Sequence, residues 1–508
     1  MTSGAEEALA AGGASWTALV LWSSLMLALC VSLTRRARFV HALRSIPSPS
    51  GALPFLGNAM QLNCSLEDFF KKLVQWSKEF GDIYLVWVGS RPFIFLYRVE
   101  SVQPLLSSSQ HIDKSLEYQY LKPWLRDGLI TSGGAKWRSR RKFLTPIFHS
   151  EMLRDYFGVA AREARVFVKC LRSELGKPEF DVIPYAKRAA LDVICECAIG
   201  HNIHTQTNYK NEYHSAVQSI TTISQIRFTN IWISNDFIFK KTALGKEHDR
   251  ALNVIHSFVN KVIAERKLAR SVRRDANSNS QSRRAETLLD MLLERTENGE
   301  QLTDEEILEE VNTFMFAGHD TVGTSVSWTL YALGRQPEYQ DKIVQEYEEI
   351  FGPDREEIDY DELHKLVWLD ACIKETWRVY PTAPLIARQI YNPITLQGTE
   401  IPVGSTVLVN SYLLHRDPRY FPEPEAYRPE RFLPGQPKAP TFAYIPFSAG
   451  SRNCIGSKFA TFETKLTLLA LLRAYRFHAI DREDQLRFVS QIVLDNVGGI
   501  RLSITPRQ

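Results

Sequence analysis

Residues 447–456 read FSAGSRNCIG, and this short loop brings together a cysteine, an arginine and two glycines. Gly450 and Gly456 flank Cys454, and glycine permits sharp turns and a close approach of the backbone to a flat ligand. Backbone amides of such a loop point at the sulfur, and the positive end of the helix expected directly after it also stabilises a thiolate. Arg452 can reach an anionic group on the same ligand. The arrangement suits a haem iron, although the loop alone is explained equally well by an inert buried cysteine.

Two pairs of residues stand at helical spacing upstream of this loop. Trp137 and Arg141 are four residues apart, and Glu375 and Arg378 are three residues apart, so each pair shares one face of a helix. Taken singly, the first pair fits a basic surface helix and the second fits an ordinary surface ion pair of little energetic value.

A third pattern predicts a long buried helix. Residues 303–306 read TDEE, a capping box that starts a helix. Apolar residues then recur at helical spacing through the sequence AGHDT at 317–321. Such a stripe by itself usually means core packing.

Together these patterns resemble those of the cytochrome P450 family. The loop is similar to the family's FxxGxRxCxG haem loop at each fixed position, namely Phe447, Gly450, Arg452, Cys454 and Gly456. The resemblance covers about residue 47 to the C-terminus. It implies a mainly α fold with small β-sheets, and a non-covalent haem b whose iron is bound by the Cys454 thiolate.

The resemblance also implies roles for residues around the haem. Trp137, Arg141, Arg388 and Arg452 are expected to bind its propionates. Glu375 and Arg378 are expected to be buried and to meet Arg431 of the PERF segment at 429–432. Planar guanidinium groups suit such a fork, so this trio is interpreted as structural, holding the Cys454 loop.

The AGHDT stretch resembles the family's AGxDT pattern on the oxygen side of the haem. This likeness assigns catalytic roles to three residues. Gly318 would leave room beside the iron and let the helix open locally, Thr321 would offer a hydroxyl to bound oxygen, and Asp320 would feed protons from solvent. His319 is interpreted as a packing or hydrogen-bonding residue.

Residues 310–322 and 415–432 look most like family 4 of the cytochromes, which includes fatty-acid ω-hydroxylases. In that family, the position of Ala317 is often a glutamate that esterifies the haem. Ala317 cannot form that bond, so we expect extractable haem and a broader apolar substrate range: fatty acids, isoprenoids or xenobiotics. The residues expected to contact substrate are Tyr118, Tyr120, Trp124, Phe314, Ala317, Leu385 and Val493.

The N-terminus predicts a membrane anchor. Residues 16–33 carry no charge, and Arg35, Arg36, Arg38 and Arg44 follow directly. About 20 apolar residues span a bilayer, and the positive-inside rule places the arginines in the cytosol. We therefore expect a lumenal segment at 1–15, a single transmembrane anchor at 16–34, a basic, proline-rich stalk at 35–57 and a cytosolic haem-thiolate domain at 58–508. This topology fits the endoplasmic reticulum membrane.

Composition limits the partners. The chain has 508 residues, 44% of them hydrophobic, and a net charge of only +3, which gives no case for nucleic-acid binding. Seven scattered cysteines indicate a reducing compartment.

The sequence contains no dinucleotide-binding motif, because there is no GxGxxG after a strand. The resemblance therefore implies electrons from NADPH–cytochrome reductase, with cytochrome b5 as a further donor. The basic residues Arg138, Arg140, Lys142 and Lys458 are interpreted either as a docking face for these partners or as a solvated surface.

The remaining pattern predicts short strands at 83–88, 93–97, 394–396, 406–410, 487–489 and 500–504. Between about 99 and 380 the chain reads as mostly helical, with a polar loop at 271–284, and a helix returns at 457–475. We find no clear linker, so these elements form one large domain behind the anchor.

Two other functions remain open. A haem-thiolate isomerase or dehydratase would need neither reductase nor dioxygen, but such family members tend to lose the acid–alcohol pair present here as Asp320 and Thr321. A non-catalytic haem or lipid carrier would not need that pair, so its presence argues against this alternative as well.

Overall fold

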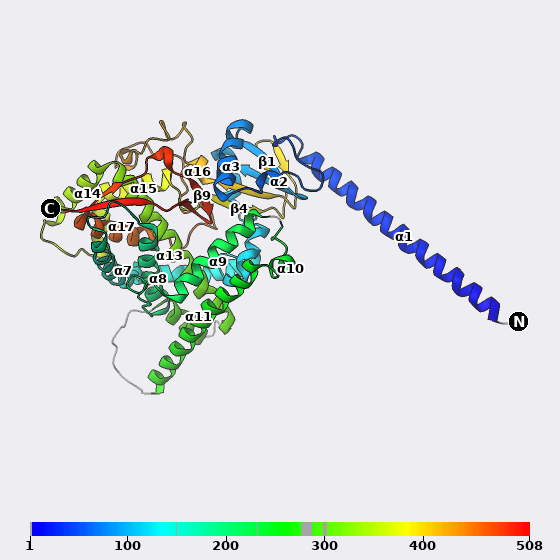
Figure 1. Cartoon of the computed structure of the whole chain (residues 1–508), viewed down its shortest axis with the longest axis horizontal. Helices are drawn as coiled ribbons and strands as arrows, with labels where there is room; N and C mark the ends of the chain where they lie inside the picture. Colours follow the sequence, from blue (N-terminus) through cyan, green and yellow to red (C-terminus); the bar gives the residue numbers. More distant parts are fainter. Residues whose placement is uncertain (1–2, 149, 231, 276–286, 298–301, 508) are drawn as a thin grey trace.

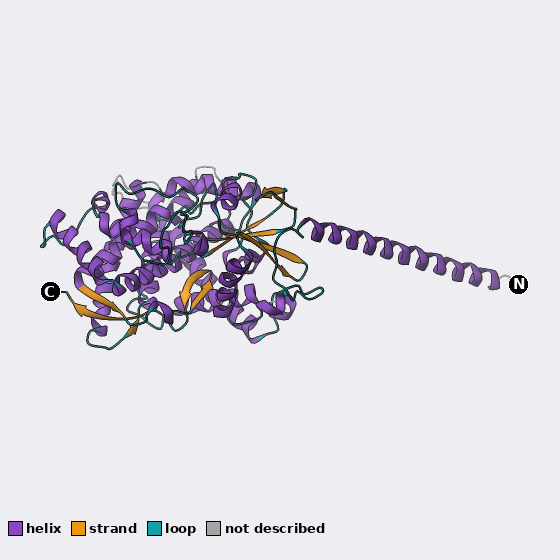
Figure 2. Ribbon diagram, turned by 90° about the horizontal axis from the view of Figure 1, so that it is seen from above, coloured by secondary structure: helices purple, strands orange, loops and turns teal. Residues whose placement is uncertain are grey.

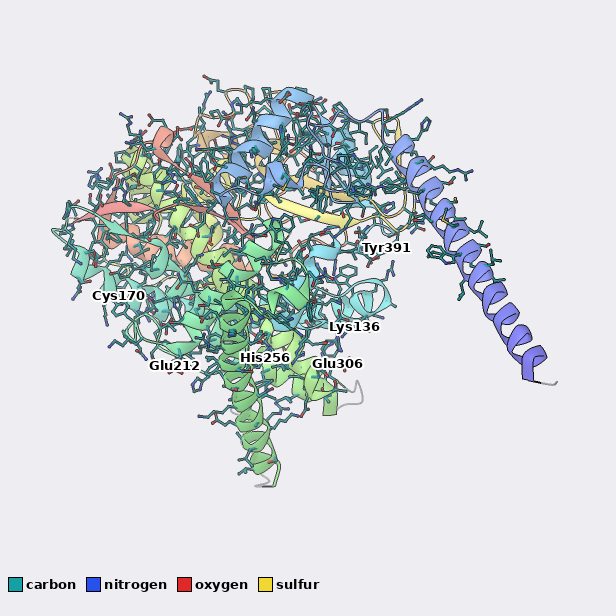
Figure 3. All side chains as sticks on the ribbon, turned by 45° about the vertical axis from the view of Figure 1, so that its right-hand side comes forward. Lys136, Cys170, Glu212, His256, Glu306 and Tyr391 are labelled. Carbon is teal, nitrogen blue, oxygen red and sulfur yellow. The ribbon has the colours of Figure 1, made fainter. Side chains whose placement is uncertain are left out.

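The computed structural model describes residues 3–148, 150–230, 232–275, 287–297 and 302–507. Helix α1 (Ser3–Ala42) extends away from a body that holds the other elements (Figure 1). Its side chains from Leu19 onward are mostly exposed, and only near its base does the helix contact the body, where Phe39 packs on Trp87 (Figure 3). Helices make up most of the body, and the strands gather near the base of α1 and near the C-terminus (Figure 2).

Helix α13 (Asp304–Arg335) is the centre of the helical part, and it begins at the predicted capping box of Thr303 and Glu306. It packs against α8 (Ile183–Ile199), α17 (Ser457–Ala474) and α15 (Val367–Val379). Its glycines allow close packing on α8, because a Cβ at Gly318 would lie 2.5 Å from the Ile194 side chain. The largest hydrophobic core surrounds α13.

The other helices surround this centre. They are α2 (Ala59–Leu62), α3 (Leu66–Phe80), α4 (Val99–Ser107), α5 (Lys122–Leu125), α6 (Gly134–Leu144), α7 (Ser150–Leu171), α9 (Glu212–Thr229), α10 (Asp236–Phe239), α11 (Ala243–Asp275), α12 (Leu288–Glu297), α14 (Pro337–Phe351) and α16 (Ser411–Leu414). Short 3₁₀ helices are η1 (Leu116–Leu121), η2 (Thr145–Phe148), η3 (Arg172–Glu174), η4 (Tyr360–Lys365), η5 (Pro429–Phe432) and η6 (Glu483–Gln485).

The largest sheet has the order β1-β2-β7-β4, with β1 (Ile83–Val88), β2 (Arg91–Leu96), β7 (Thr406–Asn410) and β4 (Leu385–Gln389). β2 and β7 are parallel, whereas the other two pairings are antiparallel. Smaller sheets pair β5 (Ile394–Leu396) with β6 (Thr399–Ile401), β9 (Phe488–Gln491) with β10 (Val493–Asn496), and β11 (Arg501–Pro506) with both β3 (Phe180–Asp181) and β8 (Tyr475–Ala479). The expected mainly α fold with small sheets is confirmed.

Two local expectations are wrong. The polar loop expected at 271–284 begins later, because residues 271–275 still belong to α11, while 276–284 lie outside the described residues. The stalk expected from residue 35 also begins later, because α1 continues to Ala42. The prolines at 47, 49 and 54 follow that helix end, where a missing N–H is tolerated.

Candidate functional site

The loop of Cys454 is held by its own backbone. The Cys454 N–H donates to the Phe447 carbonyl at 2.9 Å, and the Phe447 ring packs edge-on against Trp377 at 4.9 Å. Helix α17 begins at Ser457, directly beyond the loop. Burial raises the pKa of the Cys454 thiol, while the Gly456 amide and the cations Arg141 and Lys114 oppose that rise. The sulfur thus faces hydrogen-bond donors and positive charge, which favour a thiolate ligand.

The two glycines of the loop differ in what they require. Gly450 has a φ of +72°, and a Cβ there would lie 1.8 Å from the Leu106 carbonyl oxygen, so a larger residue cannot fit. Gly456 has an ordinary φ of −90°, and a Cβ there would make only a 3.9 Å contact with Phe148. The expectation that the backbone conformation requires glycine therefore holds for Gly450 and fails for Gly456. Gly456 acts instead through its amide, which lowers the pKa of the Cys454 thiol.

Arg452 crosslinks the loop to the segment before α6. Its guanidinium donates to the carbonyls of Ile112, Leu129 and Ser132 at 3.0, 3.1 and 2.6 Å. It also stacks on the Trp137 ring at 4.6 Å. Burial and the neighbouring Arg388 lower the pKa of Arg452 to about 9, and Tyr118 and Asp113 oppose this effect only in part.

Arg388 and Lys114 extend this group of cations. Arg388 is buried, and the hydrogen bond that it donates goes to the Ala387 carbonyl at 3.1 Å. The Lys114 ammonium lies over the Tyr118 ring at 4.8 Å, and burial together with Arg388 and Arg452 lowers its pKa well below the usual value. Within the described chain, neither cation has an ion pair with a carboxylate. Sequence reasoning missed Lys114, because a lysine in a loop carries no local signal.

These cations provide an observation against which haem can be tested. A buried cation without a counter-charge is unfavourable. Arg388 and Arg452 nevertheless lie close enough to Lys114 to lower its pKa, and Arg388 also lowers the pKa of Arg452. The Cys454 thiolate has the opposite effect on Lys114 and raises its pKa. A ligand with two carboxylates and a metal that prefers thiolate would neutralise the cations and bind the sulfur together. The residues present therefore fit haem.

Arg141 and its neighbours take different positions. Arg141 donates to the Asn453 carbonyl at 2.6 Å and to its Oδ1 at 2.7 Å, next to Cys454. Arg140, expected on an exposed basic face, is instead buried and pairs with Glu306 of α13. That part of the interpretation is wrong, because helix α6 turns Arg140 toward α13. Exposed on the surface are Arg138, Lys142 and Lys458.

The structural trio joins α15 to the PERF segment. Arg378 donates to both oxygens of Glu375, at 2.7 and 2.8 Å, and both side chains are fully buried. Arg431 approaches Glu375 at 3.4 Å and donates instead to the carbonyls of Pro422 and Glu423. A buried, doubly hydrogen-bonded carboxylate of this kind fixes the segments that it joins.

His415 continues this support toward the cysteine. Its carbonyl accepts from Arg378 at 3.2 Å, and its Nε2 accepts from the Ile445 N–H at 2.9 Å, two residues before the loop. Burial lowers the pKa of His415 to about 3, so the imidazole is neutral and can accept. No sequence pattern singles out this histidine, because its partners are distant in the chain.

Helix α13 carries the residues expected to be catalytic. The Thr321 hydroxyl donates to the Ala317 carbonyl at 2.6 Å, one turn earlier. His319 is buried, and its Nδ1 lies 2.9 Å from the Met315 carbonyl. Gly318 faces Ile194 of α8, and the helix is regular there. The expectation that Gly318 opens the helix is therefore wrong, because its missing side chain lets two helices pack.

Asp320 has a partner that the sequence did not reveal. Its Oδ1 lies 2.9 Å from the Lys187 ammonium of α8, while its Oδ2 is buried and accepts no hydrogen bond from any part of the chain that the structure describes. Lys187 also reaches Asp495 at 3.5 Å; although burial lowers the pKa of Lys187, Asp320 and Asp495 raise it above its usual value. Asp320 and His319 line a polar cavity of about 530 Å³ whose wall includes the exposed residues Val497 and Gly498. A buried acid therefore lies beside a polar opening.

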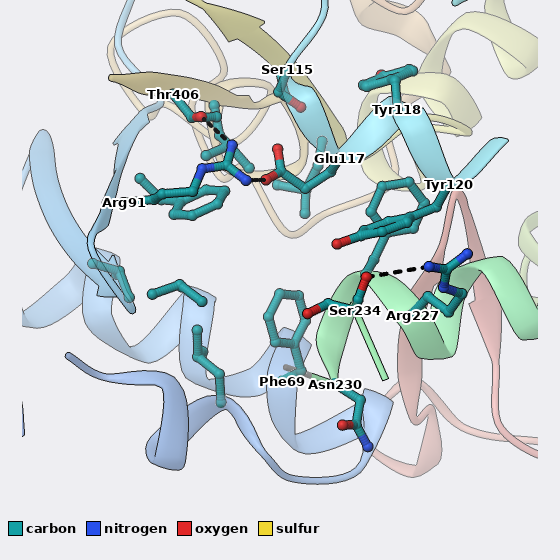
Figure 4. A pocket seen from close by; sticks show the side chains of 18 of the residues that line it. Phe69, Arg91, Ser115, Glu117, Tyr118, Tyr120, Arg227, Asn230, Ser234 and Thr406 are labelled. Carbon is teal, nitrogen blue, oxygen red and sulfur yellow. Dashed lines mark hydrogen bonds and ion pairs between the residues drawn. The ribbon is translucent and has the colours of Figure 1, made fainter. Parts of the chain in front are cut away.

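A second cavity is mostly apolar and has a volume of about 430 Å³ (Figure 4). Tyr118, Tyr120 and Leu385 line it, together with residues of β1, β2, β7 and α9. Tyr118 also contacts Lys114, so this cavity borders the group of cations. It lies within the range of volumes that small-molecule sites occupy.

The other residues expected to contact substrate do not line this cavity. Trp124 packs on Phe316 at 4.8 Å, and Phe314 packs on Phe148 at 5.3 Å. Ala317 is not in its wall either. Ile492 lines it instead of Val493, because the chain turns at Ile492 with a φ of +69° and Val493 enters the core.

Comparisons with known proteins agree with this geometry. A family profile described as Cytochrome P450 matches residues 47–500. The chain is 39% identical to Cytochrome P450 4c3 of Drosophila melanogaster, over 97% of this chain and 95% of that protein. It is 38% identical to Cytochrome P450 4V2 of Mus musculus, over 97% and 98%, and 37% identical to Cytochrome P450 4d2 of Drosophila melanogaster, over 91% and 94%.

Proposed function

This chain belongs to the cytochrome P450 family, and from that premise we propose that it is a membrane-anchored monooxygenase that hydroxylates long or bulky apolar substrates. As a family member it is a haem monooxygenase with a cysteine thiolate ligand, and its electrons come from NADPH through a reductase. The observation that carries the proposal is the convergence of Cys454 with the half-buried Lys114 and the buried Arg388 and Arg452, none of which forms an ion pair with a carboxylate in the described chain.

Each of these residues has a defined part in binding. When bound, haem supplies the activation of dioxygen, which no side chain provides. Cys454 would bind its iron, and Lys114, Arg388 and Arg452 would hold its carboxylates. Trp137 supports this by stacking on Arg452 at 4.6 Å, which fixes the direction of the guanidinium.

Proton movement is assigned to Asp320 and Thr321. Asp320 is buried beside the polar cavity, and its unpartnered Oδ2 can accept a proton from water there. The Thr321 hydroxyl donates to Ala317, which leaves its oxygen able to accept a hydrogen bond. Lys187 holds the carboxylate of Asp320 at 2.9 Å and so sets its orientation while the proton is delivered.

The membrane setting is supported by two features. A helix with an apolar window at Leu19–Ala42 is long enough to span a bilayer. Exposed aromatic side chains at Phe55, Trp232 and Phe237 lie in segments next to residues that line the apolar cavity. We place the protein in the endoplasmic reticulum membrane, where apolar substrates enter from the lipid.

The electron donors dock on the side of the thiolate. Arg138, Lys142 and Lys458 are exposed around the Cys454 loop and give an acidic partner a complementary surface. We assign this surface to NADPH–cytochrome reductase, with cytochrome b5 as the further donor.

The test is a reduced, carbon-monoxide-treated absorption spectrum of the full chain. We expect a thiolate-type Soret band in the native protein and in Cys170→Ser, a matched control whose sulfur donates to Gln206 at 3.5 Å. Cys454→Ser should lack the band. Survival of the band in Cys454→Ser would overturn the assignment, and turnover that needs neither NADPH nor dioxygen would favour an isomerase instead.

A further inference from the structure

The apolar cavity has one charged corner, at the ends of β2 and η1. Arg91 and Glu117 meet there, with Nη1 of Arg91 2.6 Å from Oε1 of Glu117 (Figure 4). Arg91 also donates to the Thr406 hydroxyl at 3.5 Å. Apart from Arg227, the rest of the wall contains apolar side chains and neutral polar groups such as Ser115 and Asn230.

Neither arginine in this wall is free to bind a substrate anion. Arg91 is neutralised by Glu117. Arg227, the other arginine of the wall, pairs with Asp236, donates to the Ile233 and Ser234 carbonyls and stacks on Phe239 at 4.0 Å. The cavity is thus close to electrically neutral, although it contains two guanidinium groups.

Glu117 carries an acceptor that the protein does not use. Its Oε1 pairs with Arg91, but its Oε2 is buried and has no hydrogen-bond partner among the residues that the structure describes. Its side chain is only 15% exposed, so bulk water satisfies it poorly. An unpaired buried carboxylate oxygen is unfavourable and is relieved by an O–H or N–H donor. A carboxylate ligand offers no donor and would be repelled.

We propose that Glu117 is a specificity-determining residue of this cavity. It selects apolar chains that end in an uncharged hydrogen-bond donor, such as a long-chain alcohol, and it disfavours the carboxylates of the same chain length. The inference rests on the proposed monooxygenase function, because it takes this cavity as the substrate site. The hydroxyl donates to Oε2 of Glu117, and the apolar chain runs along Tyr118 and Leu385 toward the group of cations.

The experiment uses the full haem-loaded chain and two probes of equal length, dodecan-1-ol and dodecanoate. Binding is followed by the substrate-induced spin-state shift and, independently, by equilibrium dialysis of labelled probe. We expect the native protein to bind the alcohol about tenfold more tightly than the carboxylate, since a charge mismatch in a partly buried site has roughly this effect.

Glu117→Gln keeps an oxygen acceptor and releases Arg91. We expect it to bind dodecanoate about tenfold better than the native protein does, a gain that the double variant Arg91→Gln/Glu117→Gln loses. Asp82→Asn is the matched control, because Asp82 pairs with Arg98 at 2.7 Å and does not line the cavity; it should leave both affinities unchanged.

Two failures are distinguishable. Absence of a thiolate Soret band, or of any response to either probe, would contradict the proposed function. An intact band with equal or tighter dodecanoate binding in the native protein, or no change in Glu117→Gln, would overturn the role of Glu117 and leave the function standing. If Glu117→Gln does not fold, Arg91→Gln alone should weaken dodecanoate further, and unchanged binding there would also overturn the inference.

Discussion

At the scale of single residues, the site is organised by charge that its own side chains do not balance. Cys454 needs hydrogen-bond donors and nearby cations to exist as a thiolate, and Arg141 and Lys114 oppose the effect of burial on its pKa. In the described ranges of the chain, the same cations form no ion pair with a carboxylate. A metal-containing ligand with two carboxylates would bind the thiolate and neutralise these cations. This explains why several positive groups are tolerated close together.

Lys114 provides a direct test of this balance. Lys114→Met removes one half-buried cation and keeps a side chain of similar length. We expect haem to leave the variant about tenfold faster, because a charge-assisted hydrogen bond to a carboxylate is lost. The measurement is haem transfer to an apoprotein acceptor. Lys122→Met is the control, since exposed Lys122 pairs with Asp127 at 2.9 Å, and equal rates in the two variants would refute the role of Lys114.

Ala317 leads to a second residue-scale prediction. Its carbonyl accepts from Thr321, and its methyl side chain has no carboxylate to esterify a haem methyl group. Acid–organic extraction of the native protein should therefore release intact haem completely. Haem that stays with the denatured polypeptide would show that another side chain forms a covalent bond and would contradict the expectation.

The residues that the sequence revealed are those whose partners lie nearby in the chain. Cys454, Gly450 and Arg452 form one local motif, and Glu375 and Arg378 share a helical turn. Lys187 and His415 were missed because their partners, at positions 320 and 445, are set by tertiary packing, and the arginines that lie near Lys114, at 388 and 452, are also distant in the chain. Spacing along one segment cannot reveal such pairs.

At the scale of elements, α13 and α6 are joined through buried charge. Glu310 of α13 accepts from the Leu129 N–H at 3.1 Å, and Arg140 of α6 lies 3.7 Å from its other oxygen. Burial raises the pKa of Glu310 to about 7, and Glu309 adds to this, while the Leu129 amide, Arg140 and Lys136 oppose it. This carboxyl group titrates near neutral pH within the helix that carries Asp320.

The raised pKa of Glu310 predicts a pH-dependent stability. The unfolded chain releases this proton near the ordinary pKa of 4.5, whereas the folded chain retains it up to about 7. Ionisation therefore disfavours the folded state as pH rises between these values, by about 3 kcal/mol above pH 7. Glu310→Gln removes this effect and keeps an acceptor for Leu129, so its thermal midpoint should exceed that of the native protein at pH 8 and approach it at pH 5. Glu305→Gln, an exposed change on the same helix, should show no such trend; a parallel shift at both pH values would contradict the prediction.

Element boundaries were predictable where caps and periodicity act locally. The capping box at Thr303 starts α13, and α17 follows the cysteine loop as expected. The strands β4 and β8 were not foreseen, and β3 has only two residues, because these elements exist through pairing with β7 and β11. The cavity wall contains Ile492 rather than the expected Val493 because the chain turns at Ile492 with a positive φ, and no sequence pattern predicts that turn.

At the scale of the whole molecule, the anchor and the cavity lie toward one side. The base of α1 and the short helix α10 are on the same side of the body (Figure 1). Exposed apolar side chains occur in the segments that flank the cavity: Phe55 is 87% exposed, Phe237 70% and Trp232 54%. Large exposed aromatic groups beside an apolar opening indicate contact with lipid.

This arrangement predicts two separate modes of membrane binding. A chain lacking residues 1–34 keeps Phe39, which packs on Trp87 at 6.3 Å, and loses most of the apolar helix that is long enough to span a bilayer. We expect the full chain to resist alkaline carbonate extraction and the shortened chain to be extracted. The shortened chain should still bind phosphatidylcholine vesicles in high salt, because burial of aromatic side chains does not depend on charge.

The second mode is tested within the shortened chain. Trp232→Ser with Phe237→Ser should release it from the vesicles, whereas Leu268→Ser, an equally exposed apolar change on α11, should not. Since α11 ends far from the base of α1 in Figure 1, the difference would assign binding to the side of the cavity rather than to general hydrophobicity. The cavity would not face the lipid if Leu268→Ser weakened vesicle binding equally, or if removal of residues 1–34 alone abolished it. An apolar substrate would then have to reach the cavity from water.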